Sequence, residues 1–157
     1  MKKYIYLAGP IADCDYQEAN EWRVYCQEKF EPGIVGISPL RCEPLEKGKR
    51  YSEVGSVVKM WSDPRAIATK NWLDTESSDL VLAYLPKELN DRRPSIGTII
   101  EIGWAIGLRK PLIIVSDDNY LMDHPLIKHN ASWRLNNLDE AVEVISGLFG
   151  DYISQVA

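Results

Sequence analysis

The sequence lacks the features of a membrane protein or a protein from an oxidising compartment. No apolar run approaches the roughly 20 residues that a membrane helix needs. The N-terminal stretch MKKYIYLAGP has too short an apolar segment for a signal peptide. The three cysteines, Cys14, Cys26 and Cys42, are odd in number and form no CxxC pair. These absences predict a protein of the reducing cytoplasm that does not bind a membrane.

Positive charge is outnumbered by negative charge, and no metal-binding pattern is present. The formal net charge is -5, whereas surfaces that bind nucleic-acid backbone are strongly basic. His124 and His129 have no cysteine or acidic residue at a metal-ligand spacing around them. We therefore predict a small-molecule ligand, no nucleic-acid polymer, no metal and no cofactor.

What the sequence does contain is typical of one globular domain. Its 157 residues, 45% of them hydrophobic and 26% charged, are enough to bury a core without disulfides or metals. No internal repeat, low-complexity tract or linker divides the chain. We predict a single domain over residues 1–157.

Strand-like and helix-like segments alternate along this chain. Apolar runs rich in β-formers predict strands at residues 3–8, 34–38, 79–85 and 111–116. Helices are expected at residues 16–30, 64–79, 95–108 and 138–149, the last after a capping-box-like Asn137 and Glu140. This alternation predicts an α/β fold with a mostly parallel sheet of the Rossmann or flavodoxin-like type. Helices should cover both faces, and the ligand should bind beyond the carboxyl ends of the strands.

Two segments are expected to be irregular. Residues 41–64 show mixed charge and no clear period, with a basic run from Lys47 to Arg50. They are interpreted as a solvated excursion, with a lid over the ligand as the alternative. The stretch PKELNDRRPS, residues 86–95, is expected to be a polar loop.

One carboxylate stands out in the stretch SIGTIIEIGWAIGL, residues 95–108, where Glu101 is the sole ionisable side chain. About one turn inside a helix, an acid gains roughly 0.3–1 kcal/mol from the helix dipole. That gain does not explain an acid on a helix that is apolar on every face, because burying a charge without a partner is costly. We therefore predict a functional role for Glu101.

Three sequence motifs resemble the nucleoside 2-deoxyribosyltransferase superfamily, which includes the 2'-deoxynucleoside 5'-phosphate N-hydrolases. They are IYLAGP, SSDLVLAYL, and S-x-G-T-x-x-E-I-G-W-A followed by KPLIIV. The resemblance implies that Glu101 is a nucleophile that attacks the anomeric carbon of deoxyribose, expels the base and forms a covalent glycosyl-enzyme. Tyr6 would then hold the Glu101 carboxylate by a hydrogen bond, although its hydroxyl could instead be satisfied elsewhere.

The resemblance also implies a substrate and an assembly. The substrate is a 2'-deoxynucleoside or its 5'-monophosphate, with an acceptor base where the sugar is transferred. Relatives complete their sites across subunits, so a homodimer or larger homo-oligomer is expected. Asn130 and Ser132 would then reach the sugar's 5' end in a neighbouring subunit.

Two positions bear on which substrate is used. Relatives usually carry an aspartate where this chain has Asn71, and an amide cannot supply a proton to the leaving base. Asp74, one helical turn later, is the candidate replacement acid; alternatively the base needs less acid help. Ser95 resembles the N-hydrolases, in which a small donor leaves room for a 5'-phosphate, or it merely caps the helix.

The sequence therefore predicts an N-deoxyribosyltransferase that passes deoxyribose from a 2'-deoxynucleoside to an acceptor base. A 5'-monophosphate N-glycosidase, which uses water, is the alternative, and a catalytically silent nucleotide-binding module is the third reading. Arg41 and Arg23 are candidates to bind a phosphate, with surface solvation as the alternative for both. The predicted substrate-binding residues are Gly9, Pro10, Arg41, Asn71, Ser95, Gly97, Asn130 and Ser132.

Overall fold

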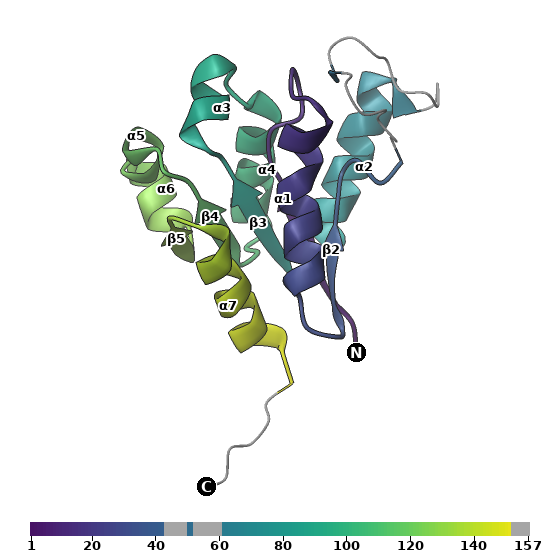
Figure 1. The fold of residues 1–157 in the computed structure, drawn as a ribbon, viewed down its shortest axis with the longest axis vertical. Helices are drawn as coiled ribbons and strands as arrows, with labels where there is room; N and C mark the ends of the chain where they lie inside the picture. Colours follow the sequence, from purple (N-terminus) through teal and green to yellow (C-terminus); the bar gives the residue numbers. More distant parts are fainter. Residues whose placement is uncertain (43–49, 52–60, 152–157) are drawn as a thin grey trace, which may run out of the picture.

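A five-stranded parallel sheet organises the chain (Figure 1). The computed structural model describes residues 1–42, 50–51 and 61–151. The strands are β1 (Lys3–Ala8), β2 (Ile34–Ile37), β3 (Leu80–Tyr84), β4 (Leu112–Val115) and β5 (Trp133–Leu135). Their order is β2-β1-β3-β4-β5, with every neighbouring pair parallel. The predicted fold class is confirmed, and the order is the flavodoxin-like one.

Helices cover both faces of this sheet. Within the described residues they are α1 (Tyr16–Lys29), α2 (Pro64–Ser77), α3 (Lys87–Arg92), α4 (Ile96–Gly107), α5 (Asn119–Met122), α6 (Pro125–Asn130) and α7 (Leu138–Phe149). α1 and α7 pack on one face, and α4, α5 and α6 pack on the other. α2 lies against β1 and α4.

Successive side chains of β1 point to opposite faces of the sheet. Ile5 and Leu7 join the core under α1 and α7, whereas Tyr6 and Ala8 join the core under α4. All four are fully buried, as expected for a central parallel strand. Tyr6 therefore lies on the side of the sheet that carries Glu101.

Local sequence signals set the helix ends. Asp15 and Glu18 form a capping box at the start of α1, and Asp63 caps α2 directly before Pro64. Asn137 accepts a hydrogen bond from the Glu140 backbone nitrogen at the start of α7, as predicted.

The structure corrects the prediction in two regions. Residues 86–95 are not wholly a loop, because α3 forms there. Its six residues include none that is buried, so no apolar stripe announced it. α5, α6 and β5 were not predicted either; α5 and α6 each bury one residue and β5 buries none, so these short elements carry no apolar pattern. Most of the predicted excursion or lid at 41–64 lies outside the described residues.

α4 is apolar in composition but is buried on one side only. Thr98, Glu101, Ile102 and Ala105 face the interior. Other isoleucines of the helix, Ile96, Ile99 and Ile100, are exposed. None of the helices described is long and apolar enough to cross a membrane.

Candidate active site

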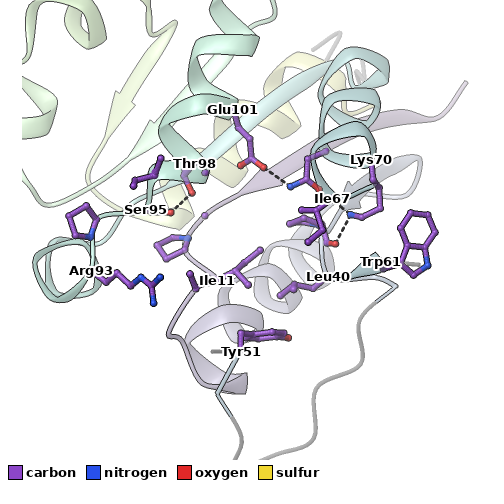
Figure 2. A pocket seen from close by; sticks show the side chains of 18 of the residues that line it. Ile11, Leu40, Tyr51, Trp61, Ile67, Lys70, Arg93, Ser95, Thr98 and Glu101 are labelled. Carbon is purple, nitrogen blue, oxygen red and sulfur yellow. Dashed lines mark hydrogen bonds between the residues drawn. The ribbon is translucent and has the colours of Figure 1, made fainter. Parts of the chain in front are cut away.

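A pocket of about 450 Å³ opens at the carboxyl end of β1, where the strand order reverses between β1 and β3. Ligands of doubly wound sheets bind at this switch point. The walls are residues 9–12 after β1, Pro39 and Leu40 after β2, Tyr51, Trp61, Ser62, residues Ile67, Lys70 and Asn71, residues 93–98, and Glu101. Figure 2 shows Arg93 and Ser95 on one side of the pocket and Ile67, Lys70 and Trp61 on the other.

Glu101 is held through one oxygen. Its Oε1 accepts hydrogen bonds from the Tyr6 hydroxyl at 2.7 Å and from Asn71 Nδ2 at 3.0 Å. No described residue donates a hydrogen bond to Oε2. The fully buried side-chain atoms that lack a hydrogen-bond partner do not include Oε2, so this oxygen is not fully enclosed. The side chain as a whole is only 6% exposed. Oε2 is therefore the oxygen that the pocket can reach.

The Glu101 carboxyl is tuned by opposing effects. Burial raises its pKa from 4.5 to about 7, while the hydrogen bond from Tyr6, the charge of Arg23 and the hydrogen bond from Asn71 each pull the pKa down. The pKa of Tyr6 is raised by burial and by the neighbouring Glu101 carboxylate. Tyr6 thus stays protonated and remains a donor, while Glu101 titrates near neutral pH.

Lys70 orients the amide that contacts this carboxylate. Lys70 Nζ donates to the Pro39 carbonyl at 2.7 Å and to Asn71 Oδ1 at 3.1 Å. Because Oδ1 accepts from an ammonium, Nδ2 is the end of the amide that faces Glu101. Asn71, predicted to bind the substrate, lines the pocket. Lys70 also lines it and was not predicted, since a lysine in a helix is ordinarily solvated.

Asp74 and Arg41 bind each other outside the pocket lining. Arg41 donates a hydrogen bond from each of its two terminal nitrogens to the Asp74 carboxylate, at 2.6 and 2.7 Å. Lys70 Nζ lies 3.8 Å from the same carboxylate. The charge of Asp74 is thereby paired with two cations. Asp74, predicted as the acid, and Arg41, predicted to bind substrate, are not among the residues that line the pocket.

The start of α4 presents small polar groups to the pocket. Ser95 is the N-cap residue of α4, but its side chain makes no capping hydrogen bond; its Oγ instead lies 2.7 Å from Thr98 Oγ1. Gly97 has open space where a Cβ would stand. Arg93 also lines the pocket, a residue that sequence reasoning missed because it fell in the predicted loop. The adjacent arginines Arg92 and Arg93 before Pro94 were the sequence signal that could have identified it.

The turn after β1 requires glycine. A Cβ on Gly9 would lie 2.6 Å from Trp22 Cζ2 and 3.1 Å from the Tyr84 carbonyl oxygen. Backbone and indole therefore approach too closely for any other residue to fit without displacement. This contact holds Gly9 and Pro10 as one wall of the pocket.

Several candidates lie away from the pocket. Asn130 Nδ2 donates to the Leu126 carbonyl, and Ser132 Oγ accepts from the Leu112 backbone nitrogen. Arg23 is 1% exposed, so the surface position given as the alternative for it is wrong, and Arg23 is not among the residues that line the pocket. Among the residues that the structure describes, no group of three or more His, Cys, Asp or Glu side chains could hold a metal ion.

Comparison with known proteins identifies the family of this chain. The nucleoside 2-deoxyribosyltransferase family profile matches residues 5–147. The chain belongs to this family. No curated protein sequence matches it significantly.

Solved structures share the fold at low sequence identity. A conserved protein from Enterococcus faecalis V583 is 18% identical, with a TM-score of 0.63, and the match covers 95% of this chain and 100% of that chain. The 2-deoxyribosyltransferase of Bacillus psychrosaccharolyticus is 16% identical, with a TM-score of 0.62 and 88% and 90% coverage. The CMP N-glycosidase BcmB of Clostridium botulinum is 17% identical, with a TM-score of 0.54 and 94% and 100% coverage.

Proposed function

We propose that this protein transfers 2-deoxyribose from a 2'-deoxynucleoside to an acceptor base through a covalent intermediate on Glu101. The observation that carries the proposal is the Glu101 carboxylate itself. It is buried beside the pocket, held by two donors on Oε1, and reachable through Oε2. A carboxylate held in this way suits attack on a sugar's anomeric carbon.

In the proposed first step, Oε2 forms a bond to C1' while the bond from C1' to the base nitrogen breaks. The departing base takes the bonding electron pair, and positive charge develops at C1' in the transition state. The adjacent carboxylate stabilises that charge before it bonds. In the second step a ring nitrogen of an acceptor base attacks C1', loses its proton to solvent, and releases Glu101 as the carboxylate.

The described side chains give little support for protonation of the leaving base by the protein. Asn71 is an amide whose two polar atoms already contact Lys70 and Glu101. Asp74 is paired with Arg41 outside the pocket lining, which does not favour its role as the acid. We propose that the base departs as an anion and takes its proton from water.

The test is turnover and intermediate trapping in a Glu101→Gln variant. We expect Glu101→Gln to abolish turnover of deoxynucleosides while substrate binding stays measurable, because the shape is kept and the nucleophile is lost. Glu143→Gln, an exposed change of the same kind on α7, is the matched control. Mass spectrometry of quenched wild type should show one deoxyribosyl group on the peptide that contains Glu101. Near-wild-type activity in Glu101→Gln would sink the mechanism.

A 5'-monophosphate N-glycosidase, with water as acceptor, is the second candidate, and the start of α4 favours it. Arg93, Ser95 and Gly97 all line the pocket, and Arg93 and Ser95 lie on the same side of it (Figure 2). Arg93 supplies a planar cation suited to phosphate, and Ser95 supplies a small hydroxyl that is not spent on capping the helix.

Substitution of Ser95 separates the two candidates. In Ser95→Asp a carboxylate would stand beside any bound phosphate, and unit charges about 4 Å apart repel by about 4 kcal/mol at an effective dielectric near 20. Monophosphate turnover should fall by orders of magnitude while nucleoside turnover holds. The measurement is kcat/KM for a deoxynucleoside and its monophosphate, each with and without an acceptor base. An unchanged ratio would reject the phosphate role.

We also propose that two copies associate through an apolar face formed by α2 and α4. Its exposed members are Trp72, Leu73, Ile99 and Ile100, and Trp72 meets Trp104 edge to face at 5.3 Å. Clustered exposed apolar side chains of this kind mark protein interfaces. Asn130 and Ser132 lie outside their own chain's pocket, as a contribution to a partner's site would require.

Sedimentation tests the assembly. Wild type should sediment as a dimer or larger species at micromolar concentration, and Ile99→Glu should shift it toward monomer. Val24→Glu on α1, where the side chain is 43% exposed, serves as the control and should not change the species. A wild type that remains monomeric would end the proposal.

A further inference from the structure

Arg23 is a charged residue in an unusual place. It lies on α1 with 1% of its surface exposed, and it forms no ion pair with a carboxylate of the described residues. Taking a cation out of water is costly unless other groups compensate. The contacts that compensate Arg23 therefore indicate what it does.

Those contacts all come from the end of β1 and from α1. Nε donates to the Leu7 carbonyl at 3.1 Å, Nη2 donates to the Gly9 carbonyl at 3.0 Å, and Nη1 donates to the Ala19 carbonyl. The guanidinium carbon lies 4.5 Å from the centroid of the Trp22 ring. Arg23 thus ties the turn after β1, which is a wall of the pocket, to the helix behind it.

The same guanidinium is one of the charges around Glu101. The titratable groups that act on Glu101 are Tyr6 from β1, Lys70 from α2 and Arg23 from α1. Asp74, also on α2, acts on Tyr6 and lies 3.8 Å from Lys70. Burial lowers the pKa of Arg23 to about 10, so it remains cationic at neutral pH. Its charge lowers the pKa of Glu101 and opposes the effect of burial.

We propose that Arg23 is a positioning residue for the reaction proposed above, fixing the Gly9–Pro10 wall and supplying a buried positive charge that favours the ionised form of Glu101. The inference rests on the proposed function of Glu101 as nucleophile. It explains why an arginine, rather than an apolar residue of similar size, occupies the interior between α1 and β1. The hydrogen bonds place the wall, and the charge acts on the carboxylate.

The test separates these two effects by substitution. Arg23→Met removes charge and hydrogen bonds together, whereas Arg23→Lys keeps the charge and loses most of the bonds. Arg134→Met is the matched control, because Arg134 also donates to a backbone carbonyl, that of Met122, but belongs to β5. For each variant, kcat and KM are measured from pH 5 to pH 9 on the best wild-type substrate.

We expect the acidic limb of the kcat/KM profile to move to higher pH in Arg23→Met and to stay near wild type in Arg23→Lys and Arg134→Met. Each pH unit of that movement lowers activity at pH 6 about tenfold. Arg23→Lys should lose activity by one factor at all pH values, since only the wall is disturbed. The proposal would be overturned if the acidic limb lay at the same pH in Arg23→Met and wild type. It would also be overturned if the limb moved equally in Arg23→Met and Arg23→Lys.

Two further measurements keep the test decisive. If Arg23→Met does not fold, Arg23→Gln replaces it, because Gln keeps a neutral donor, and its limb should rise while that of Arg23→Lys does not. Carbon NMR of labelled glutamate, assigned with Glu101→Gln, reports the Glu101 pKa directly. An inactive wild type would count against the proposed function, whereas a Glu101 pKa that is the same in wild type and the neutral variant would refute the role of Arg23.

Discussion

The free energy of unfolding of Glu101→Gln minus that of wild type should be larger at alkaline pH than at acidic pH. Burial raises the pKa of Glu101 from 4.5 to about 7. Between these two values the folded chain holds a proton that the unfolded chain has released. Wild-type stability therefore falls as pH rises through this window and stays lower above it. Glutamine has no proton to lose, so the variant lacks this decline.

The magnitude follows from the same two values. At about 1.4 kcal/mol per pH unit, the rise from 4.5 to about 7 corresponds to a stability difference on the order of 3 kcal/mol. Glu101→Gln retains most of the side-chain volume, so packing changes little. The carboxamide oxygen must still accept the hydrogen bonds that Tyr6 and Asn71 donate to Oε1 of Glu101. Any loss of stability from weaker hydrogen bonds there is the same at every pH.

The assay is urea unfolding of both proteins at several pH values between 4.5 and 8.5. The quantity of interest is the free energy of unfolding of the variant minus that of wild type, because every other titrating group cancels in the difference. This difference should grow by about 3 kcal/mol with rising pH. A difference that is constant with pH, or one that shrinks, would show that Glu101 ionises as an ordinary exposed carboxyl and would refute the reasoning.

Three further outcomes are expected. Tyr6→Phe should lower kcat and move the acidic limb of the pH profile upward, because the Tyr6 hydrogen bond lowers the pKa of Glu101; an unmoved limb would contradict this. Gly9→Ala should reduce both activity and Tm, since its Cβ would press on Trp22, whereas Gly147→Ala, which meets nothing within 4 Å, should not. Deoxyuridine should react faster than deoxycytidine in matched assays, because uracil leaves more readily as an anion; the reverse order would indicate an acid on the leaving base.

The parts of the fold that could be predicted were those whose signal is local. β1, β3 and β4 are buried on both faces and read as apolar runs. β5 has three residues, none of them buried, and α3 has no buried residue. Their positions are set by the elements already formed around them, and short segments of this kind carry little pattern of their own.

The candidate site divides in the same way. Glu101 was singled out because a lone acid in an apolar helix is conspicuous. Tyr6 was proposed from the resemblance of IYLAGP to the family's first motif. The pairing of Asp74 with Arg41 depends on the approach of two segments 33 positions apart, which no local spacing predicts. Arg23 was misplaced because its neighbours in the sequence do not show that β1 carbonyls lie against α1.

The hydrogen bonds on Glu101 connect the chemistry of the site to its cost in stability. Two donors from separate elements, Tyr6 on β1 and Asn71 on α2, both select Oε1. In the proposed mechanism, these hydrogen bonds favour the charged carboxylate and leave Oε2 with few interactions to lose on attack. A fully solvated carboxylate would have to shed water before reaching C1', and a fully hydrogen-bonded one would be a weaker nucleophile. In the proposed mechanism, the burial that raises the pKa of Glu101 also destabilises the carboxylate before it bonds to the sugar, so the same effect lowers stability and favours attack.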